Sequence, residues 1–388
     1  MQKMLAKLEE EATELGVEYT TAHAKYKVEP VLDKGLRTPW SVEFIPGPLA
    51  GMLVTNRGGA VLLYRDGKAT TVEGTPRTVE VGQGGLLDVE AHPNFKENGW
   101  IYLAFADPGE GEAKGKTMTR VVRGKLKAEG EKVLWTDQQD IFKAKPEHYI
   151  NSGVHFGCKI AFDPKDSSVL FFGIGERGSG PHAQDLKRPN GKIHRVKDDG
   201  TIPSDNPFVS VKDAYPSIWS YGHRNPQGLR FDLAGNLWDT EHAPRGGDEC
   251  NLVKMGRNYG WPLVTFGIDY GDKPITVPWI ELATVKGEKP AVEMPVHRWL
   301  PSIAACGLGV SPGGAFPGWK GDLFAGGLAG SVVDRLRMKV ENGVGTMVEQ
   351  ETIISGMGRV RDITPGPDGS LYVVLNEPDR IVRIVPAN

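Results

Sequence analysis

Several short stretches of this 388-residue chain place imidazole, guanidinium or amide side chains where a strand is expected to begin. His155 lies between glycines at one such strand entrance, and Gln83 and Arg224 occupy corresponding positions before two other strands. These side chains could converge at one end of a shared structure. A neutral histidine there could act as a general base, because its pKa lies near working pH. Each residue taken alone also fits an ordinary surface or core position.

A second pattern predicts an anionic ligand. Arg359 and Arg361 flank Val360, and strand alternation would put both arginine side chains on one face. Guanidinium groups bind carboxylates bidentately, so this pair together with Arg224 predicts a carboxylate-bearing ligand. The alternative is a solvated sheet edge.

A third stretch, 241–249, combines acids with glycine and proline. It has too few spaced acids for an EF-hand loop, which alternates ligands over 12 residues. Calcium also accepts backbone carbonyls, and Gly/Pro loops present them well. Glu249, Tyr259 and Asp269 are further oxygen donors.

The elements that must position these groups repeat along the chain. Six loosely similar units each read as an inner strand, a Gly- or Pro-bearing turn and a second strand. Their inner strands fall at 40–44, 86–89, 159–164, 228–232, 306–310 and 361–365. This repetition predicts an all-β, six-bladed β-propeller, with a pair of β-sandwiches as the alternative. A strand near 28–31 is expected to complete the last blade.

Six units in 388 residues leave about 65 residues each, more than the roughly 40 to 50 of familiar propeller repeats. The excess predicts long inserted loops at 105–118, 136–153, 178–219 and 262–300. Residues 1–15 suit a short amphipathic helix, so we divide the chain into a helical extension at 1–25 and a catalytic propeller at 26–388. Residues 1–15 lack the apolar core of an intact signal peptide.

Composition narrows the function classes. The 50 glycines, 28 prolines and 39% hydrophobic residues favour many short strands and turns. A net charge of −3 lacks the basic excess that is typical of nucleic-acid-binding proteins. No run of about 18 apolar residues exists that could span a membrane. Three cysteines, Cys158, Cys250 and Cys306, do not make a disulfide framework.

The ordered motifs resemble those of the soluble glucose/sorbosone dehydrogenase family, the pyrroloquinoline quinone (PQQ)-dependent aldose sugar dehydrogenases. The resemblance runs from about residue 39 to 384. It rests on the motifs at 82–88, 155–157, 183–186, 191–193, 202–208, 222–228, 241–251, 256–262, 359–362 and 366–369. It implies a six-bladed propeller that holds PQQ and calcium at one end of its channel and oxidises aldoses at C1 to lactones.

The resemblance also implies individual roles. His155 matches the family's catalytic base, and Arg224 matches the residue that hydrogen-bonds the reacting oxygen. The cofactor contacts match Gln83, Arg224, Asn225, Arg359 and Arg361. The carbonyls that hold the cofactor's calcium match Ala243 and Pro244, and a second, structural calcium site matches Glu249 and Tyr259.

Three positions depart from the family pattern. Val154 stands where members carry Asp or Asn, Ala329 stands where the glucose-oxidising branch has a cofactor-binding lysine, and Ala243 replaces a usual glycine. Two other functions stay open: a lactonase-type, metal-dependent hydrolase and a non-catalytic binding propeller. The expected partners are a small sugar and an unidentified electron acceptor. We expect a periplasmic monomer or homodimer whose export signal, if it has one, is missing from this sequence.

Overall fold

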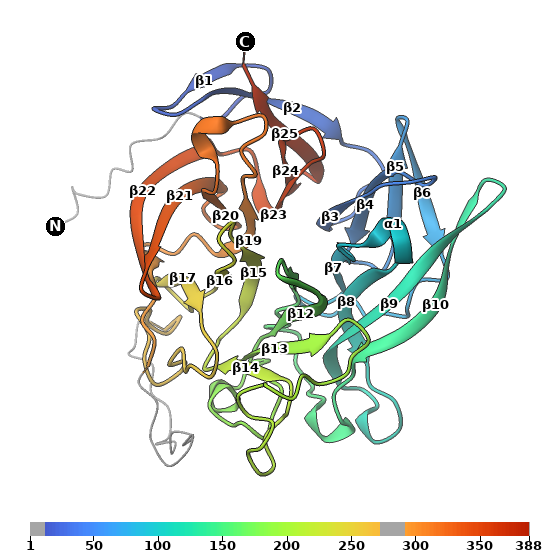
Figure 1. Ribbon diagram of the computed structural model, residues 1–388, viewed down its shortest axis with the longest axis vertical. Coiled ribbons are helices and arrows are strands. Elements are labelled where there is room, and N and C mark those ends of the chain that lie inside the picture. The colour runs from blue at the N-terminus through green and yellow to red at the C-terminus, as the bar shows by residue number, and fades with distance from the viewer. Residues whose placement is uncertain (1–11, 272–291, 388) are drawn as a thin grey trace.

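The computed structural model of the chain describes residues 12–271 and 292–387. In this part of the chain the regular structure is almost entirely β, which confirms the predicted all-β class. The sheets are arranged around a central axis (Figure 1). None of the described helices is long and apolar enough to cross a membrane.

Five sheets contain the strands of residues 12–271 and 292–387. The eight-stranded sheet contains β3 (Pro39–Ile45), β4 (Gly51–Asn56), β5 (Val61–Arg65), β6 (Lys68–Glu73), β7 (Leu86–Ala91), β8 (Ile101–Pro108), β9 (Thr117–Glu129) and β10 (Lys132–Phe142). One four-stranded sheet contains β11 (Ile160–Asp163), β12 (Asp166–Ile174), β13 (Lys192–Lys197) and β14 (Ile218–Tyr221). The next contains β15 (Pro226–Phe231), β16 (Leu237–Glu241), β17 (Asp248–Val253) and β18 (His297–Trp299).

The last four-stranded sheet contains β19 (Ala305–Val310), β20 (Leu323–Gly327), β21 (Val332–Glu341) and β22 (Val344–Ser355). The fifth sheet contains β1 (Glu18–Thr20), β2 (Lys25–Leu32), β23 (Arg359–Pro365), β24 (Leu371–Asn376) and β25 (Arg380–Pro386). The helices of the described ranges are α1 (Phe95–Asn98) and four 3-10 turns at Gly111–Ala113, Pro146–His148, Gly180–Ala183 and Pro317–Trp319.

The eight-stranded sheet consists of two antiparallel four-stranded units. Strands β3 to β6 pair in sequence, and so do β7 to β10. A short parallel pairing of β6 with β10, at Val72 with Val133 and Glu73 with Leu134, joins the two units at their outer edges. Each unit therefore resembles the separate four-stranded sheets.

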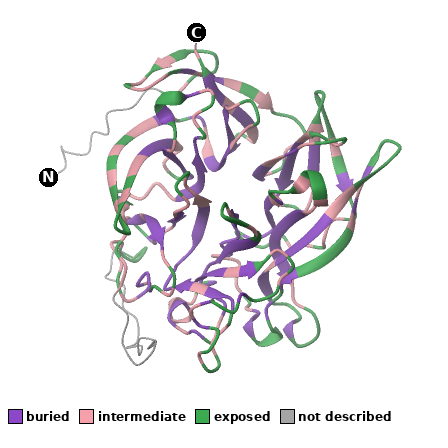
Figure 2. Ribbon diagram, in the orientation of Figure 1, coloured by how far each residue is buried: buried purple, intermediate pink, exposed green. Residues whose placement is uncertain are grey.

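The innermost strands form a closed ring. Strands β3, β7, β11, β15, β19 and β23 each contact the next, and β23 contacts β3. Figure 2 shows that the strands around the centre are largely buried. Glycine allows the closest approaches: a Cβ on Gly307 of β19 would lie 2.5 Å from the Cα of Asp362 in β23.

The axis is held by a buried ion network as well as by apolar packing. The Lys159 ammonium lies 2.8 Å from a carboxylate oxygen of Asp88 and 2.8 Å from one of Asp362. The Ser41 Oγ lies 2.8 Å from a carboxylate oxygen of each acid, so its single proton can be donated to either one. Because these residues come from different innermost strands or their entrances, the network ties several sheets together.

The two ends of the chain close the ring within one sheet. Strand β2 pairs antiparallel with β25, so the predicted closing strand near 28–31 is correct. The prediction of a helical extension at 1–25 is wrong from residue 12 onward, and residues 1–11 lie outside the described part. The Thr13 N–H donates to Ser355 at 2.8 Å, Leu15 bridges to Val28, and β1 pairs with β2. Strand pairing with distant residues therefore organises residues 12–25.

Three of the four predicted inserted loops are shorter than expected. The ends of β8 and β9 take up much of 105–118, and β10 continues to Phe142 inside 136–153. The range 178–219 contains all of β13. The predicted loop at 262–300 overlaps residues outside the described part.

Candidate active site

His155 lies in the connection that leads into β11, in a left-handed backbone conformation with φ of 54°. This conformation is uncommon for a residue with a side chain, so neighbouring contacts must hold it. Its N–H donates to Oε1 of Gln83 at 2.9 Å, and the N–H of Gln83 donates to the Gly153 carbonyl at 2.7 Å. The predicted site residues His155 and Gln83 are therefore in contact.

The His155 ring is oriented by a carboxylate that we did not predict. Its Nδ1 atom lies 2.7 Å from Oε1 of Glu176, which is 2% exposed and follows β12. Burial lowers the pKa of His155, and the charges of Arg224 and Arg177 add to this, whereas Glu176 opposes it. The imidazole is thus neutral near pH 7, with its Nδ1 proton shared with Glu176. This tautomer leaves Nε2 free to accept a proton.

Arg224 precedes β15 and is fixed through its backbone and its side chain. The Arg224 N–H donates to Oε2 of Glu241 at 2.7 Å, and Nη1 donates to the His242 carbonyl at 3.0 Å. The guanidinium carbon lies 5.2 Å from the centre of the Trp261 ring. Within the described residues, Arg224 has no carboxylate at ion-pair distance from its guanidinium, and its buried Nε has no hydrogen-bond partner.

Asn225 sits beside Arg224 and links two sheets. Its Oδ1 accepts hydrogen bonds from the Gly157 N–H and from Nε2 of Gln227, both at 3.2 Å. Because Gly157 closes the loop that carries His155, Asn225 holds the predicted base and the predicted oxygen-binding arginine in one frame.

Arg361 is a second buried arginine whose guanidinium has no carboxylate partner among the described residues. Its guanidinium carbon lies 4.0 Å from the centre of the Trp40 ring, and Nη1 is 3.6 Å from Sγ of Cys306. Burial lowers the pKa of Arg361. The strand does not alternate simply here, because a register irregularity lies between Val360 and Asp362. Arg359 is the more exposed of the pair.

His242 was missed by the sequence reasoning, although it lies inside the 241–249 stretch. Burial lowers the pKa of His242 well below its usual value, and the charges of Arg224, Arg361, His155 and Arg359 lower it further. These four side chains therefore lie close enough to His242 for their charges to act on it. Its Nε2 is buried without a hydrogen-bond partner among the described residues.

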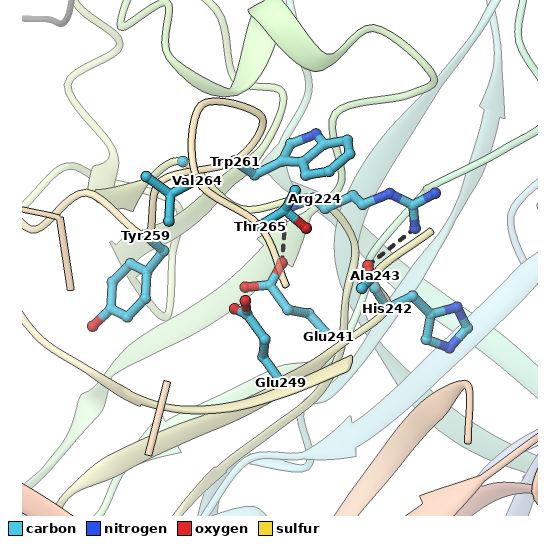
Figure 3. A pocket seen from close by; sticks show the side chains of 10 residues that line it. Arg224, Glu241, His242, Ala243, Glu249, Tyr259, Trp261, Val264 and Thr265 are labelled. Atoms are coloured by element: carbon cyan, nitrogen blue, oxygen red, sulfur yellow. Dashed lines mark hydrogen bonds between the residues drawn. The ribbon is translucent and has the colours of Figure 1, made fainter. Parts of the chain in front are cut away.

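A small acidic cavity of about 10 Å³ lies beside Arg224, His242 and Ala243, and Glu241 and Glu249 also line it (Figure 3). In Figure 3 the carboxylates of Glu241 and Glu249 point toward each other. Burial raises the pKa of Glu249 well above its usual value, and the charge of Glu241 adds to this. The buried Glu241 and the half-buried Glu249, with room between them for about one water-sized particle, suit a cation.

The phenol of Tyr259 is committed elsewhere. Its hydroxyl donates to the Leu252 carbonyl at 2.6 Å and accepts from the Lys254 N–H at 2.8 Å. The backbone carbonyl of Tyr259 is therefore the better candidate for a metal donor. Glu249 and Tyr259 line the same cavity, and their pairing as calcium ligands stays a prediction.

Deeper behind this cavity, His223, Asp239 and Glu241 bring one ligand atom each within 4.8 Å of one another. The two acids raise the pKa of His223 to about 9 against the effect of burial. His223 is therefore an internal positive charge that compensates the buried acids.

The carbonyls of Ala243 and Pro244 accept no hydrogen bond from the described residues. Val154 turns its carbonyl to the Arg177 guanidinium. Ala329 lies on an exposed loop, where its N–H donates to Ile303 at 2.9 Å.

The site can be tested against PQQ and calcium from its own groups. Two buried guanidinium groups without carboxylate partners suit a ligand with several carboxylates. The orphaned Nε2 of His242 adds a hydrogen-bonding group to this region. The free carbonyls of Ala243 and Pro244 are donors that a hard cation accepts. The residues present fit both groups.

The chain is similar to known proteins of one family. The profile described as "Glucose / Sorbosone dehydrogenase" matches residues 36–383. Aldose sugar dehydrogenase YliI of Escherichia coli is 39% identical over 373 residues, which cover 95% of each chain. The apo crystal structure of the soluble aldose sugar dehydrogenase from E. coli is 37% identical with a TM-score of 0.80, covering 93% of this chain and 100% of that one.

A structure with bound cofactor also matches. The PQQ-bound aldose sugar dehydrogenase from Streptomyces coelicolor is 25% identical with a TM-score of 0.70, covering 93% of this chain and 98% of that one.

Proposed function

The chain belongs to the glucose/sorbosone dehydrogenase family, and from this premise we propose that it oxidises aldose sugars at C1 to lactones with PQQ and calcium. The observation that carries the proposal is the His155–Glu176 pair, at 2.7 Å, beside two buried arginines that lack carboxylate partners. Such an arrangement provides a general base next to a binding region for an anionic cofactor.

We propose that the cofactor carboxylates are held by Arg361, Arg359 and Asn225, with Gln83 supporting the loop of His155. His242 is added to this set because its unpartnered Nε2 faces the same cationic region. Ala243 and Pro244 would supply carbonyl ligands to the calcium beside the cofactor. Glu249, with the carbonyl of Tyr259, would hold a second, structural calcium in the small acidic cavity.

The protein's part of the chemistry follows from the free Nε2 of His155. That atom takes the proton of the C1 hydroxyl while the C1–O bond becomes a carbonyl. Glu176 stabilises the imidazolium that forms, as the carboxylate of a catalytic triad does. The Arg224 guanidinium stabilises charge that develops on the reacting oxygen. When bound, PQQ supplies the hydride acceptor, and its calcium acts as a Lewis acid.

We also propose that the ring has six blades, with the eight-stranded sheet counted as two, and that 26–388 forms the catalytic unit. Family resemblance supports a periplasmic location. A lactonase-type hydrolase has less support, because such a site needs carboxylates converging on one metal beside the substrate. Here the two nearby carboxylates, Glu241 and Glu249, share their small cavity with the Arg224 cation and with His242, whose pKa is lowered by burial and by nearby arginines.

The test is a titration of purified apo-protein with PQQ and calcium, followed by aldoses and a dye acceptor. We expect the quinone absorption to shift on binding and then to bleach with sugar. His155→Ala should abolish turnover and leave PQQ binding nearly intact. Absence of any quinone binding at high calcium would contradict the proposal and favour a binding scaffold.

A further inference from the structure

Arg177 is a fully buried arginine with an unusual environment. It is 1% exposed and follows Glu176 directly. Within residues 12–271 and 292–387, its guanidinium has no carboxylate at ion-pair distance, and its Nε has no partner. Burial lowers the pKa of Arg177 to about 10. A buried charge without a counter-charge is destabilising, so a buried arginine at this position needs a physical explanation.

All hydrogen bonds of the Arg177 guanidinium go to the loop of His155 and to the strand beneath it. Nη1 donates to the Val154 carbonyl. Nη2 donates to the Ser152 carbonyl and to Oγ1 of Thr117, both at 2.7 Å. The planar fork of one guanidinium thus bridges the two carbonyls that precede His155.

The other side of the loop is held by the face of the same group. The guanidinium carbon lies 3.4 Å from the centre of the Phe156 ring, which follows His155 in sequence. Arg177 therefore contacts the residue before His155 and the residue after it. His155 in turn makes its ring contact to Glu176, the neighbour of Arg177.

Both partners in this arrangement have strained backbones. Arg177 has φ of 64° and His155 has φ of 54°, in the left-handed region that costs non-glycine residues of the order of 1–3 kcal/mol when the conformation is sparsely populated. Such conformations persist only where the surroundings determine them. The turn at 175–178 thereby directs two adjacent side chains toward the same loop. Glu176 contacts the imidazole of His155, and Arg177 contacts the backbone carbonyls before it.

We propose that Arg177 is a positioning residue, whose guanidinium clamps residues 152–156 and so holds the His155 imidazole against Glu176. This inference rests on the proposed role of His155 as the base. Arg177 acts through the loop and does not contact the region around His242 by any of its hydrogen bonds. A lysine could keep the charge but could not bridge two carbonyls while stacking on Phe156.

The test compares Arg177→Met and Arg177→Lys with a matched control, Arg335→Met. Arg335 is also fully buried, but it lies in β21 and pairs with Asp322, Glu349 and Glu351. A misplacement of about 1 Å can lower a rate about 100-fold, so we expect kcat of Arg177→Met to fall about 10- to 100-fold. The sugar KM and the PQQ Kd should stay within about threefold, and Arg177→Lys should recover part of kcat.

A pH profile separates this role from general support of the fold. The charged or titratable groups that act on His155 are Glu176, Arg224 and Arg177, and His242 lies nearby. Loss of the Arg177 cation raises the pKa of His155, so the acid limb of kcat/KM should move to higher pH in Arg177→Met. The limb should stay in place in Arg177→Lys and in Arg335→Met, even if Arg335→Met lowers the melting temperature.

A second measurement uses the apo-protein and needs no turnover. Histidine-selective NMR should show a downfield Nδ1 proton for His155 bound to Glu176 in the wild type and in Arg335→Met, and its loss in Arg177→Met. A wild-type kcat, pH limb and Nδ1 signal in Arg177→Met would overturn the proposal. If Arg177→Met does not fold, wild-type kcat and signal in Arg177→Lys would overturn it instead. If the wild type oxidises no sugar, the proposed function fails, and the NMR signal still reports on Arg177.

Discussion

The Nδ1 atom of His155 lies 2.7 Å from Oε1 of Glu176, and the second carboxylate oxygen of Glu176 is buried without a hydrogen-bond partner among the described residues. Among the described residues, the imidazole of His155 is therefore the hydrogen-bond partner of the Glu176 carboxylate. This relationship sets the tautomer of His155 and directs Nε2 away from the acid, where it can meet substrate.

Replacing Glu176 by Gln should leave the fold intact and reduce the rate. An amide can present a donor to Nδ1 and favour the wrong tautomer, which in a serine protease triad lowers kcat about 10⁴-fold. We expect a loss of at least about 100-fold in kcat, with PQQ affinity unchanged in a spectral titration. A small rate loss would show that Glu176 only supports the loop.

The pH dependence of kcat/KM should report the His155 pKa. Burial holds that pKa below its usual value, which is about 6.5. The base works when neutral, so activity is lost as pH falls through this pKa, and the acid limb should lie below about 6.5. Glu176 raises the pKa of His155, so Glu176→Gln should move the limb to lower pH. A shift to higher pH would contradict the assignment.

Truncating Arg361 should weaken cofactor binding more than chemistry. Removing one partner of a buried charged hydrogen-bonded pair costs about 2–5 kcal/mol, so we expect the PQQ Kd of Arg361→Ala to rise at least about 30-fold. Arg359→Ala should have a smaller effect because Arg359 is more exposed. Equal effects of the two variants in a quinone titration would argue against a buried anion contact at Arg361.

Strand entrances were the part of the site that the sequence could predict. His155, Gln83, Arg224 and Arg361 stand at equivalent places in repeated units, and the structure brings the first two into contact and the others around His242. Glu176 follows a strand instead of preceding one. In the sequence, Glu176 stands out only as an acid between Gly175 and Gly178. Its role depends on β12 lying beside the loop of His155, which the sequence does not show.

Long-range pairing explains the other differences. A helical extension was predicted through residue 25, yet Leu15 bridges to Val28 and the next strand, β1, pairs with β2. Likewise, the side-chain oxygen of Tyr259 looked like a metal donor until Leu252 and Lys254 were found to use it. In both cases the deciding partner cannot be identified from the order of the residues alone.

The acidic cavity gives a prediction about calcium and stability. A cation that binds only the folded state stabilises it by mass action, about 2.7 kcal/mol at a hundredfold excess over Kd. Calcium should therefore raise the melting temperature of the apo-protein relative to a chelator control. Glu249→Gln should lose at least part of that rise. An unchanged calcium response in Glu249→Gln would remove Glu249 from the ligand set.

The ion network on the axis should be a major determinant of stability. Lys159 is 3% exposed, and Asp88 and Asp362 are both fully buried. Among the described residues, Lys159 is the one cation at ion-pair distance from these two carboxylates. Lys159→Met removes it, and breaking a buried pair in this way costs about 3–5 kcal/mol. We expect the free energy of unfolding at pH 7, measured with denaturant, to fall by about that amount. The control Lys127→Met removes an exposed lysine paired with Glu129 and should leave stability nearly unchanged.

The Lys159 variant should also lose less stability at acid pH. Burial raises the pKa of Asp362, but Lys159 and Arg230 outweigh this and hold that pKa below its usual value. With a depressed folded-state pKa, Asp362 stabilises the fold above its unfolded pKa, and this contribution disappears as pH falls through the folded value. A deficit that stays the same from pH 7 down to pH 3 would show that the network acts through packing instead of charge.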